Sequence, residues 1–300
     1  MLNVDALYNS ALKINELLAS RGLSVQKKFG QNFLIHPEVR AKLCDALGAA
    51  RGDRVWEIGA GLGAETALLL RTGAEVCAFE LDRGFCAVLD ELFCAAYPDT
   101  WSLVKGDVLH TWKAQARAET AGRGELLLFG NLPYNIAGLL TGTFIENGMI
   151  FRRCVVTVQK EVACRMLSPA GGADYSPLSV LCQAVYTARR VANIKRANFY
   201  PAPNVDSVCV QFDKRPALNE RVFAPDFSPL VRALFAQRRK TLSNNLQVYL
   251  GGNRDVAEAV LDSCGIDRTA RAEMLAPEDF FALHAALRGI APDAHYGFSI

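Results

Sequence analysis

The chain has few histidines, no closely spaced cysteine pairs and a formal net charge of only +2. Its 300 residues include nine cysteines, none spaced C-x-x-C, and four scattered histidines, at His36, His110, His284 and His295. This pattern argues against a disulfide framework and against a zinc site formed by sequence neighbours. We therefore expect chemistry that uses no metal ion.

Membrane-spanning and export signals are also missing from the pattern. The longest uncharged stretch, residues 126–145, is long enough to cross a bilayer but contains two asparagines, a proline and three glycines. No basic segment leads into an apolar run near the amino terminus, and no coiled-coil repeat argues for assembly. The sequence therefore predicts a cytoplasmic, monomeric protein without membrane contact.

Short apolar runs alternate with helical stretches between residues 54 and 212. The runs that have the length of strands are 55–58, 75–79, 103–104, 126–129, 155–158 and 205–212. Residues 64–71 and 137–146 have the leucine and alanine content of helices that cross over a sheet. This alternation predicts an α/β fold with a Rossmann-like, doubly wound and mostly parallel sheet.

The ends of the chain differ in texture from this central part. Residues 1–26 carry Ala6, Leu7, Ala11, Ile14, Leu17 and Leu18 at helical spacing, which predicts an amphipathic covering helix. Residues 216–300 are helical and punctuated by proline. We therefore expect an amino-terminal extension over 1–26, a catalytic domain over 27–215 and a small helical domain over 216–300.

A glycine-rich turn follows the first predicted strand, with Gly59, Gly61 and Gly63 at alternate positions. Dinucleotide enzymes favour the spacing G-x-G-x-x-G, which seats a pyrophosphate, so the shorter spacing favours S-adenosylmethionine. Glu80 stands 21 positions after Gly59, where an acid accepts hydrogen bonds from ribose hydroxyls, and Asp107 follows the third strand. Alternatively, the glycines only form a tight connection between two elements, and the two acids only cap helices.

A second motif, Asn131-Leu132-Pro133-Tyr134, follows the strand at 126–129. An exocyclic adenine amine is a poor nucleophile, and the Asn131 oxygen and the Pro133 carbonyl are candidate acceptors for its N–H groups. Tyr134 offers a face on which a flipped base stacks, and Phe199 is the candidate for the opposite face. Alternatively, the motif is only a turn fixed by proline, and Phe199 is a core residue.

Six motifs in order make the chain similar to the ribosomal RNA adenine dimethyltransferase family over residues 25–290. They are Phe29-Gly30-Gln31-Asn32-Phe33-Leu34, Glu57-Ile58-Gly59-Ala60-Gly61-Leu62-Gly63, Glu80-Leu81-Asp82, Asn131-Leu132-Pro133-Tyr134-Asn135-Ile136, residues 199–207 and Gln237-Arg238-Arg239-Lys240-Thr241-Leu242. The resemblance implies a class I methyltransferase sheet. It also implies that Asn32 and Leu34 contact the cofactor together with Gly59, Glu80, Asp107 and Asn131.

The resembled family suggests dimethylation of two adjacent adenines near the 3′ end of small-subunit rRNA, in an immature ribosomal particle. Residues 187–250 contain 11 basic and 4 acidic residues, an excess that suits RNA phosphates. The basic candidates beside the motifs are Lys27, Lys28, Arg189, Arg190, Lys195, Arg196, Arg238, Arg239 and Lys240. The alternatives are a large-subunit rRNA methyltransferase of macrolide resistance and a noncatalytic assembly factor.

Overall fold

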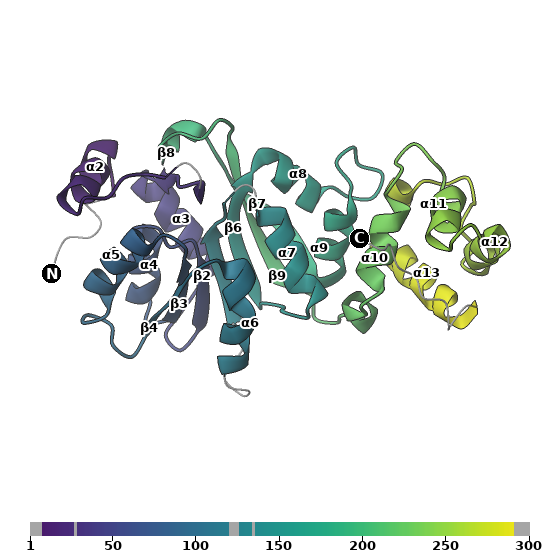
Figure 1. The fold of residues 1–300 in the computed structure, drawn as a ribbon, viewed down its shortest axis with the longest axis horizontal. Helices are drawn as coiled ribbons and strands as arrows, with labels where there is room; N and C mark the ends of the chain where they lie inside the picture. The colour runs from purple at the N-terminus through teal and green to yellow at the C-terminus, as the bar shows by residue number, and fades with distance from the viewer. Residues whose placement is uncertain (1–7, 27–28, 120–125, 134–135, 291–300) are drawn as a thin grey trace. The chain divides into compact units, whose positions relative to one another are not determined.

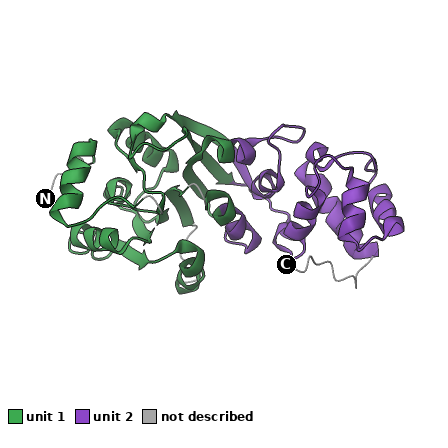
Figure 2. Cartoon of the chain, turned by 45° about the horizontal axis from the view of Figure 1, so that its top comes forward, with its two compact units in different colours: residues 1–140, 151–163, 189–213 green, residues 141–150, 164–188, 214–300 purple. Residues whose placement is uncertain are grey.

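The computed structural model describes residues 8–26, 29–119, 126–133 and 136–290, which form two compact units (Figure 2). Unit 1 comprises residues 1–140, 151–163 and 189–213, and unit 2 comprises 141–150, 164–188 and 214–300. The boundary expected at 215/216 lies beside the start of the last segment of unit 2. Unit 2 also takes two shorter segments from the region expected to belong to the catalytic domain.

The order of elements along the chain alternates strands with helices up to β6 and is helical after β9 (Figure 1). The elements are α2 (Ala11–Ser20), β1 (Phe33–Leu34), α3 (Pro37–Leu47), β2 (Arg54–Ile58), α4 (Ala64–Arg71), β3 (Glu75–Glu80), α5 (Arg83–Phe93), β4 (Trp101–Lys105), α6 (Val108–Ala118), β5 (Leu126–Asn131), α7 (Ala137–Glu146), β6 (Arg153–Gln159), α8 (Lys160–Leu167), α9 (Pro177–Val185), β7 (Tyr186–Ile194), β8 (Phe199–Tyr200), β9 (Ser207–Lys214), α10 (Phe227–Leu234), α11 (Leu242–Tyr249), α12 (Arg254–Ser263) and α13 (Pro277–Ile290).

Seven strands form one sheet in the order β4-β3-β2-β5-β6-β9-β7. The pairs from β4 to β6 are parallel, and β9 runs antiparallel to β6. Helix α4 connects β2 to β3 and α5 connects β3 to β4, in one direction across the sheet, whereas α6 connects β4 to β5 in the other direction. Because such crossovers are right-handed, α4 and α5 cover one face of the sheet and α6 covers the opposite face. The direction in which successive strands are added to the sheet reverses between β2 and β5, and open α/β sheets bind ligands at the carboxyl edge beside such a reversal.

The six strands and two helices expected from the sequence are present, with ends that differ by up to two residues. Strand β7, by contrast, has no counterpart among the expected strands. The strand lies at the edge of the sheet. Its two end residues are buried, and its middle, which includes Arg189 and Arg190, is exposed or partly exposed. An edge strand needs no continuous apolar run, so its pattern resembles that of a solvated loop.

The amino-terminal helix α2 packs on the glycine-rich turn and on α5. Its buried residues Ile14, Leu17 and Leu18 join a cluster with Leu62, Phe85 and Val88. This contact confirms the expected covering helix over its described part, whereas Ala6 and Leu7 lie outside the described residues. Ser10 begins the helix by accepting a hydrogen bond from the backbone N–H of Lys13 at 3.3 Å.

Unit 2 is held together by an aromatic core between its helices. Phe227 stacks on Phe281 with 4.9 Å between ring centroids, and Phe235 stacks on Phe280 at 5.9 Å. Helix α10, the residue that follows it and helix α13 supply these rings, so the carboxyl-terminal part has a core of its own. Within the described ranges, no helix is long and apolar enough to cross a membrane.

Candidate cofactor and substrate cleft

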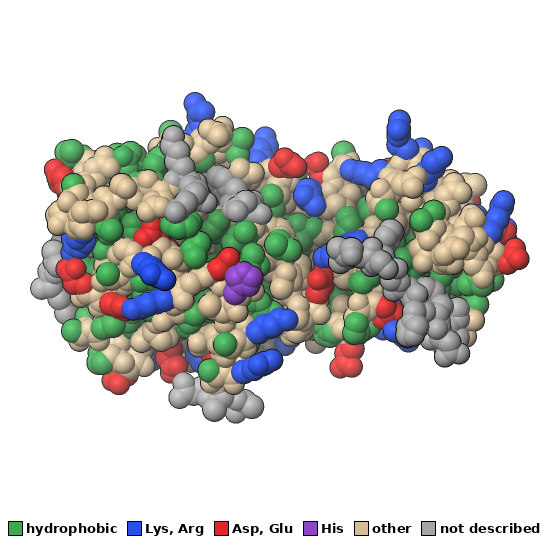
Figure 3. Space-filling model, viewed as in Figure 1, with side chains coloured by type: hydrophobic (Ala, Val, Ile, Leu, Met, Phe, Trp, Pro, Cys, Tyr) green, Lys and Arg blue, Asp and Glu red, His purple; other side chains and the backbone are tan. Residues whose placement is uncertain are grey.

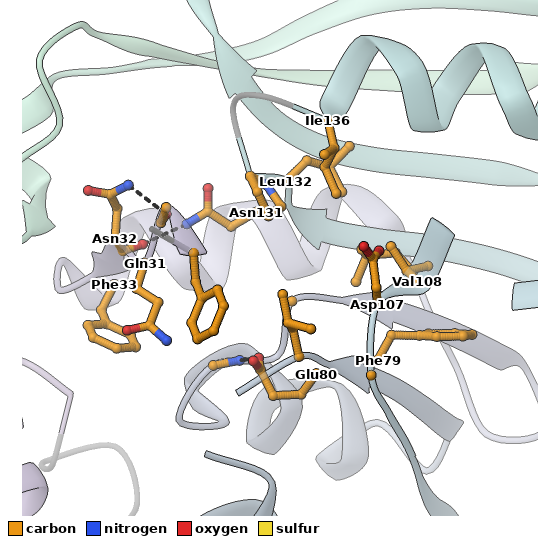
Figure 4. Close-up of a pocket in the computed structure, with 18 residues that line it drawn as sticks. Gln31, Asn32, Phe33, Phe79, Glu80, Asp107, Val108, Asn131, Leu132 and Ile136 are labelled. Atoms are coloured by element: carbon orange, nitrogen blue, oxygen red, sulfur yellow. Dashed lines mark hydrogen bonds between the residues drawn. The ribbon is translucent and has the colours of Figure 1, made fainter. Parts of the chain in front are cut away.

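A cleft of about 760 Å³, including space open to solvent, lies at the carboxyl edge of the sheet in unit 1 (Figure 4). The residues that line it come from the segment before β1 and from the turns that follow β2, β3, β4 and β5. Eight of the predicted site positions are among them: Asn32, Gly59, Gly61, Glu80, Asp107, Asn131, Leu132 and Pro133.

The glycine-rich turn lines the cleft. Three of its glycines have a backbone conformation that other residues rarely adopt. Gly59, Gly61 and Gly63 have φ angles of 75°, 59° and 89°. A Cβ atom on Gly61 would lie 3.3 Å from Cε1 of Phe33, across the cleft wall. The turn therefore leaves bare backbone facing the cleft, as a site for a nucleoside requires.

Glu80 lies at the end of β3 and its carboxylate is held by two backbone N–H groups. Gly61 donates to Oε2 and Asp82 donates to Oε1, both at 2.8 Å. The side chain is only 7% exposed, and burial raises its pKa to about 7 although both hydrogen bonds oppose the shift. The carboxylate is thus fixed in place and is poised to change its charge near neutral pH.

Asn131 ends β5 and contacts the segment before β1. Its Nδ2 donates to the carbonyl oxygen of Asn32 at 2.9 Å, which leaves Oδ1 as the acceptor of the amide. A Cβ atom on Gly59 would lie 3.7 Å from the backbone oxygen of Asn131. The glycine-rich turn and the Asn131 turn therefore lie next to each other at the same sheet edge.

The Pro133 carbonyl, an expected acceptor for the target amine, has another use in the structure. It accepts hydrogen bonds from the backbone N–H groups of Ile136 at 3.0 Å and Ala137 at 3.2 Å, where α7 begins. No described residue donates to the carbonyl of Leu132, which also lines the cleft. Within the described residues, the Pro133 carbonyl is thus engaged at the start of α7 and the Leu132 carbonyl is not.

Asp107 caps a helix and Phe199 lies in the core, which are the structural roles given above as alternatives to roles in the site. The Asp107 side chain accepts from the backbone N–H of Leu109 at 2.9 Å and begins α6, although it also lines the cleft. Phe199 is 3% exposed, belongs to the hydrophobic core and pairs with Leu34 across the β1–β8 ladder. Neither Leu34 nor Phe199 reaches the cleft lining, and Tyr134 lies outside the described residues.

Several residues that line the cleft were not singled out from the sequence. Phe29, Gly30 and Gln31 before β1 and Phe33 in β1 form one wall, and Phe79, Leu81 and Val108 lie beside the turns after β3 and β4. The motif Phe29–Leu34 was the available signal, but a segment before the sheet cannot be assigned to its edge by spacing alone. Among the described residues, no group of three or more His, Cys, Asp or Glu is arranged to hold a metal ion.

The sheet order, the glycine-rich turn after β2 and the acid that ends β3 define a class I methyltransferase fold. A solved dimethyladenosine transferase from Plasmodium falciparum has this fold, with a TM-score of 0.71 and 24% identity, over 85% of this chain and 97% of its own. The solved 23S rRNA methyltransferase ErmE matches with a TM-score of 0.59 and 22% identity, over 83% and 97%. These likenesses establish the architecture of the catalytic part.

The family follows from the sequence match. The family model described as Ribosomal RNA adenine dimethylase matches residues 22–288. A relative from Treponema pallidum, named Ribosomal RNA small subunit methyltransferase A, is 42% identical over 287 residues, which are 94% of this chain and 98% of the relative. The chain belongs to the ribosomal RNA adenine dimethylase family, and the resemblance inferred from its six motifs is confirmed.

Proposed function

We propose that this protein transfers methyl groups from S-adenosylmethionine to the N6 amines of two adjacent adenines in a 3′-terminal hairpin loop of 16S rRNA. The reaction takes place on an immature small ribosomal subunit in the cytoplasm. The observation that carries the proposal is that the glycine-rich turn and the Asn131-Leu132-Pro133 turn line one cleft. Family membership and the name of the Treponema pallidum relative support the choice of substrate.

The groups in the cleft fit a methyl donor of this kind. Glu80 would accept hydrogen bonds from the ribose hydroxyls, and the glycine turn would let the nucleoside lie against bare backbone. Asp107 adds an acidic group to the same lining, which favours a cation. When bound, S-adenosylmethionine supplies a methyl group activated by a positively charged sulfur.

Asn131 and Leu132 would prepare the target amine for attack. The lone pair of an adenine amine is delocalised into the ring, so acceptors for its N–H groups favour the pyramidal geometry that attack requires. Oδ1 of Asn131 and the carbonyl of Leu132 are such acceptors, and Pro133 restricts the turn that carries them. Tyr134 would stack on the flipped base. This arrangement needs no strong general base.

Binding of the methyl donor is expected to strengthen as pH rises from 6 to 7 and to level off above about pH 7. Burial raises the pKa of Glu80 to about 7 in the free protein, and ribose hydroxyls would bind its ionised form. Donor binding therefore releases a proton below pH 7 and weakens by up to about tenfold per unit as the acid protonates. Calorimetric titration with S-adenosylmethionine between pH 5.5 and 8.5 measures this dependence.

Glu80→Gln supplies the comparison for this pH profile. The variant keeps an acceptor of similar shape but has no carboxylate to titrate, so it should bind the donor more weakly and with a flat profile. A slope that persists in the variant, or a variant that binds the donor as tightly as the wild type above pH 7, would exclude Glu80 as the ribose acceptor.

Four basic side chains are available to contact RNA phosphates. Within the described part of the chain, Lys195, Arg196, Arg239 and Lys240 are exposed and their side chains form no ion pair or hydrogen bond. Arg238 beside them is engaged by the carbonyl of Ala173 at 3.0 Å and by Glu273 at 3.5 Å. On the face drawn in Figure 3, Lys and Arg side chains lie among Asp and Glu side chains.

The double variant Arg239→Ala/Lys240→Ala is expected to reduce the salt dependence of binding to the small subunit. Each phosphate contact contributes roughly 0.7 to 0.9 to the slope of log affinity against log salt, so two lost contacts lower the slope by about 1.4 to 1.8. Filter binding over a salt series measures the slope. Arg254→Ala, which removes an exposed arginine paired with Glu258, should leave it unchanged; an equal change in both variants would argue against a specific phosphate contact.

The test of the proposed function is transfer of a labelled methyl group to unmethylated small subunits, followed by mass analysis of the nucleosides. Dimethyladenosine in a 3′-proximal hairpin is the expected product. Label confined to large-subunit RNA would indicate the macrolide-resistance activity instead. Binding of the particle without any uptake of the donor would indicate a noncatalytic assembly factor.

A further inference from the structure

Gln31 lies in the wall of the cleft (Figure 4), and both ends of its side-chain amide form hydrogen bonds. Its Oε1 accepts a hydrogen bond from the backbone N–H of Gln26 at 2.7 Å, and its Nε2 donates to Oδ2 of Asp82 at 2.9 Å. One partner is a donor and the other an acceptor, so an amide satisfies both where a carboxylate or an ammonium satisfies one.

Asp82 gives this contact a fixed anchor. It is 7% exposed, and its other carboxylate oxygen accepts from the backbone N–H of Gly84 at 2.8 Å at the start of α5. Its own backbone N–H donates to Glu80 at 2.8 Å. Gln31 therefore attaches the cleft wall to a residue that both α5 and the end of β3 hold in place.

The residue next to Gln31 determines how the amide of Asn131 is turned. Nδ2 of Asn131 donates to the backbone carbonyl of Asn32 at 2.9 Å. Because an amide that places its nitrogen on this carbonyl must place Oδ1 elsewhere, the position of the Asn32 backbone sets the direction of the acceptor. A shift of the wall segment would release this constraint.

We propose that Gln31 is a positioning residue that keeps the Asn32 carbonyl where it orients Asn131 toward the target amine. This inference rests on the proposed function of Asn131. Loss of the contact between Gln31 and Asp82 slows methyl transfer, because the acceptor loses its fixed direction. It does not weaken donor binding to the same extent, because the backbone N–H groups that hold Glu80 are unchanged.

An exchange of the two partners tests this role. Gln31→Glu places a carboxylate against that of Asp82, and Asp82→Asn leaves the Gln31 amide without its acceptor. The double variant Q31E/D82N restores one donor and one acceptor, since the amide at position 82 donates to the new carboxylate. The oxygen of that amide still begins α5, for which asparagine is as suitable as aspartate.

Each single variant is expected to slow single-turnover methyl transfer to small subunits by about tenfold, the equivalent of one charged hydrogen bond. The double variant should return to within about threefold of wild type, and the donor Kd should stay within about threefold throughout. The matched control is Gln115→Ala on α6, which loses a contact with Glu119 at 3.2 Å and should keep the wild-type rate. Unchanged transfer in Q31E, a double variant as slow as the single ones, or a donor Kd that weakens as much as the rate falls overturns the proposal.

The side-chain amide resonance of Asn131 provides a readout that does not depend on methyl transfer. Gln31→Glu should shift this resonance, and the double variant should return it to the wild-type position. If the wild-type protein transfers no methyl group to small subunits, the proposed function fails, while the resonance still tests the contact. A resonance that does not move in Q31E overturns the positioning role.

Discussion

Asn131→Ala is expected to slow methyl transfer by a factor on the order of 100 to 1,000 while the protein remains folded. The change removes Oδ1, the proposed acceptor for the target amine, from the edge of the cleft. It also removes one hydrogen bond, to the Asn32 carbonyl, which affects the free energy of unfolding by about 1 kcal/mol. Single-turnover transfer to small subunits and a thermal melt together separate these two effects.

Asn147→Ala is the matched control for this prediction. The Asn147 side chain also donates to a backbone carbonyl, that of Thr143 at 2.8 Å, but it is exposed and does not line the cleft. The control should transfer methyl groups at the wild-type rate. If Asn131→Ala retained more than about a tenth of wild-type activity, another group would have to prepare the amine.

Gly63→Ala is expected to lower the free energy of unfolding by about 2 to 5 kcal/mol. Gly63 has φ of 89°, and a left-handed conformation costs an alanine about 1 to 2 kcal/mol. An added Cβ would lie 2.6 Å from Cε2 of Phe93 and 3.0 Å from Cδ2 of Leu89, and such overpacking costs about 1 to 3 kcal/mol more. Chemical denaturation of both proteins measures the difference.

Gly22→Ala separates the two contributions. Gly22 also has a positive φ, 65°, but a Cβ there would have no heavy atom within 4 Å. Only the conformational part remains, about 1 to 2 kcal/mol. Equal losses in the two variants would mean that Phe93 and Leu89 move aside without measurable strain.

The sheet and the cofactor side of the cleft could be predicted because both depend on local patterns. Buried parallel strands are continuous apolar runs, and the spacing from Gly59 to Glu80 reflects one turn, one crossover helix and one strand. Strand β7 lacks such a signal, because its exposed edge position tolerates arginines. The sequence therefore predicts the buried centre of the sheet better than its edge.

The other side of the cleft depends on contacts between distant parts of the chain. Spacing does not indicate that Asn32 meets Asn131, and only the family resemblance brought Asn32 into the site. The use of the Pro133 carbonyl to start α7 likewise appears only in three dimensions. Phe199 looked suitable for stacking because it is aromatic beside prolines, but its pairing with Leu34 buries it.

The short β1–β8 ladder has a consequence for how the cleft assembles during synthesis. Leu34 pairs with Phe199, about 165 positions later in the chain, and the backbone N–H of Ile35 donates to Asn198 at 2.9 Å. Contacts of such long separation form only after the intervening chain has been ordered. A nascent chain that ends before residue 199 therefore lacks the partner strand that holds the wall, so the complete pocket becomes available late in translation.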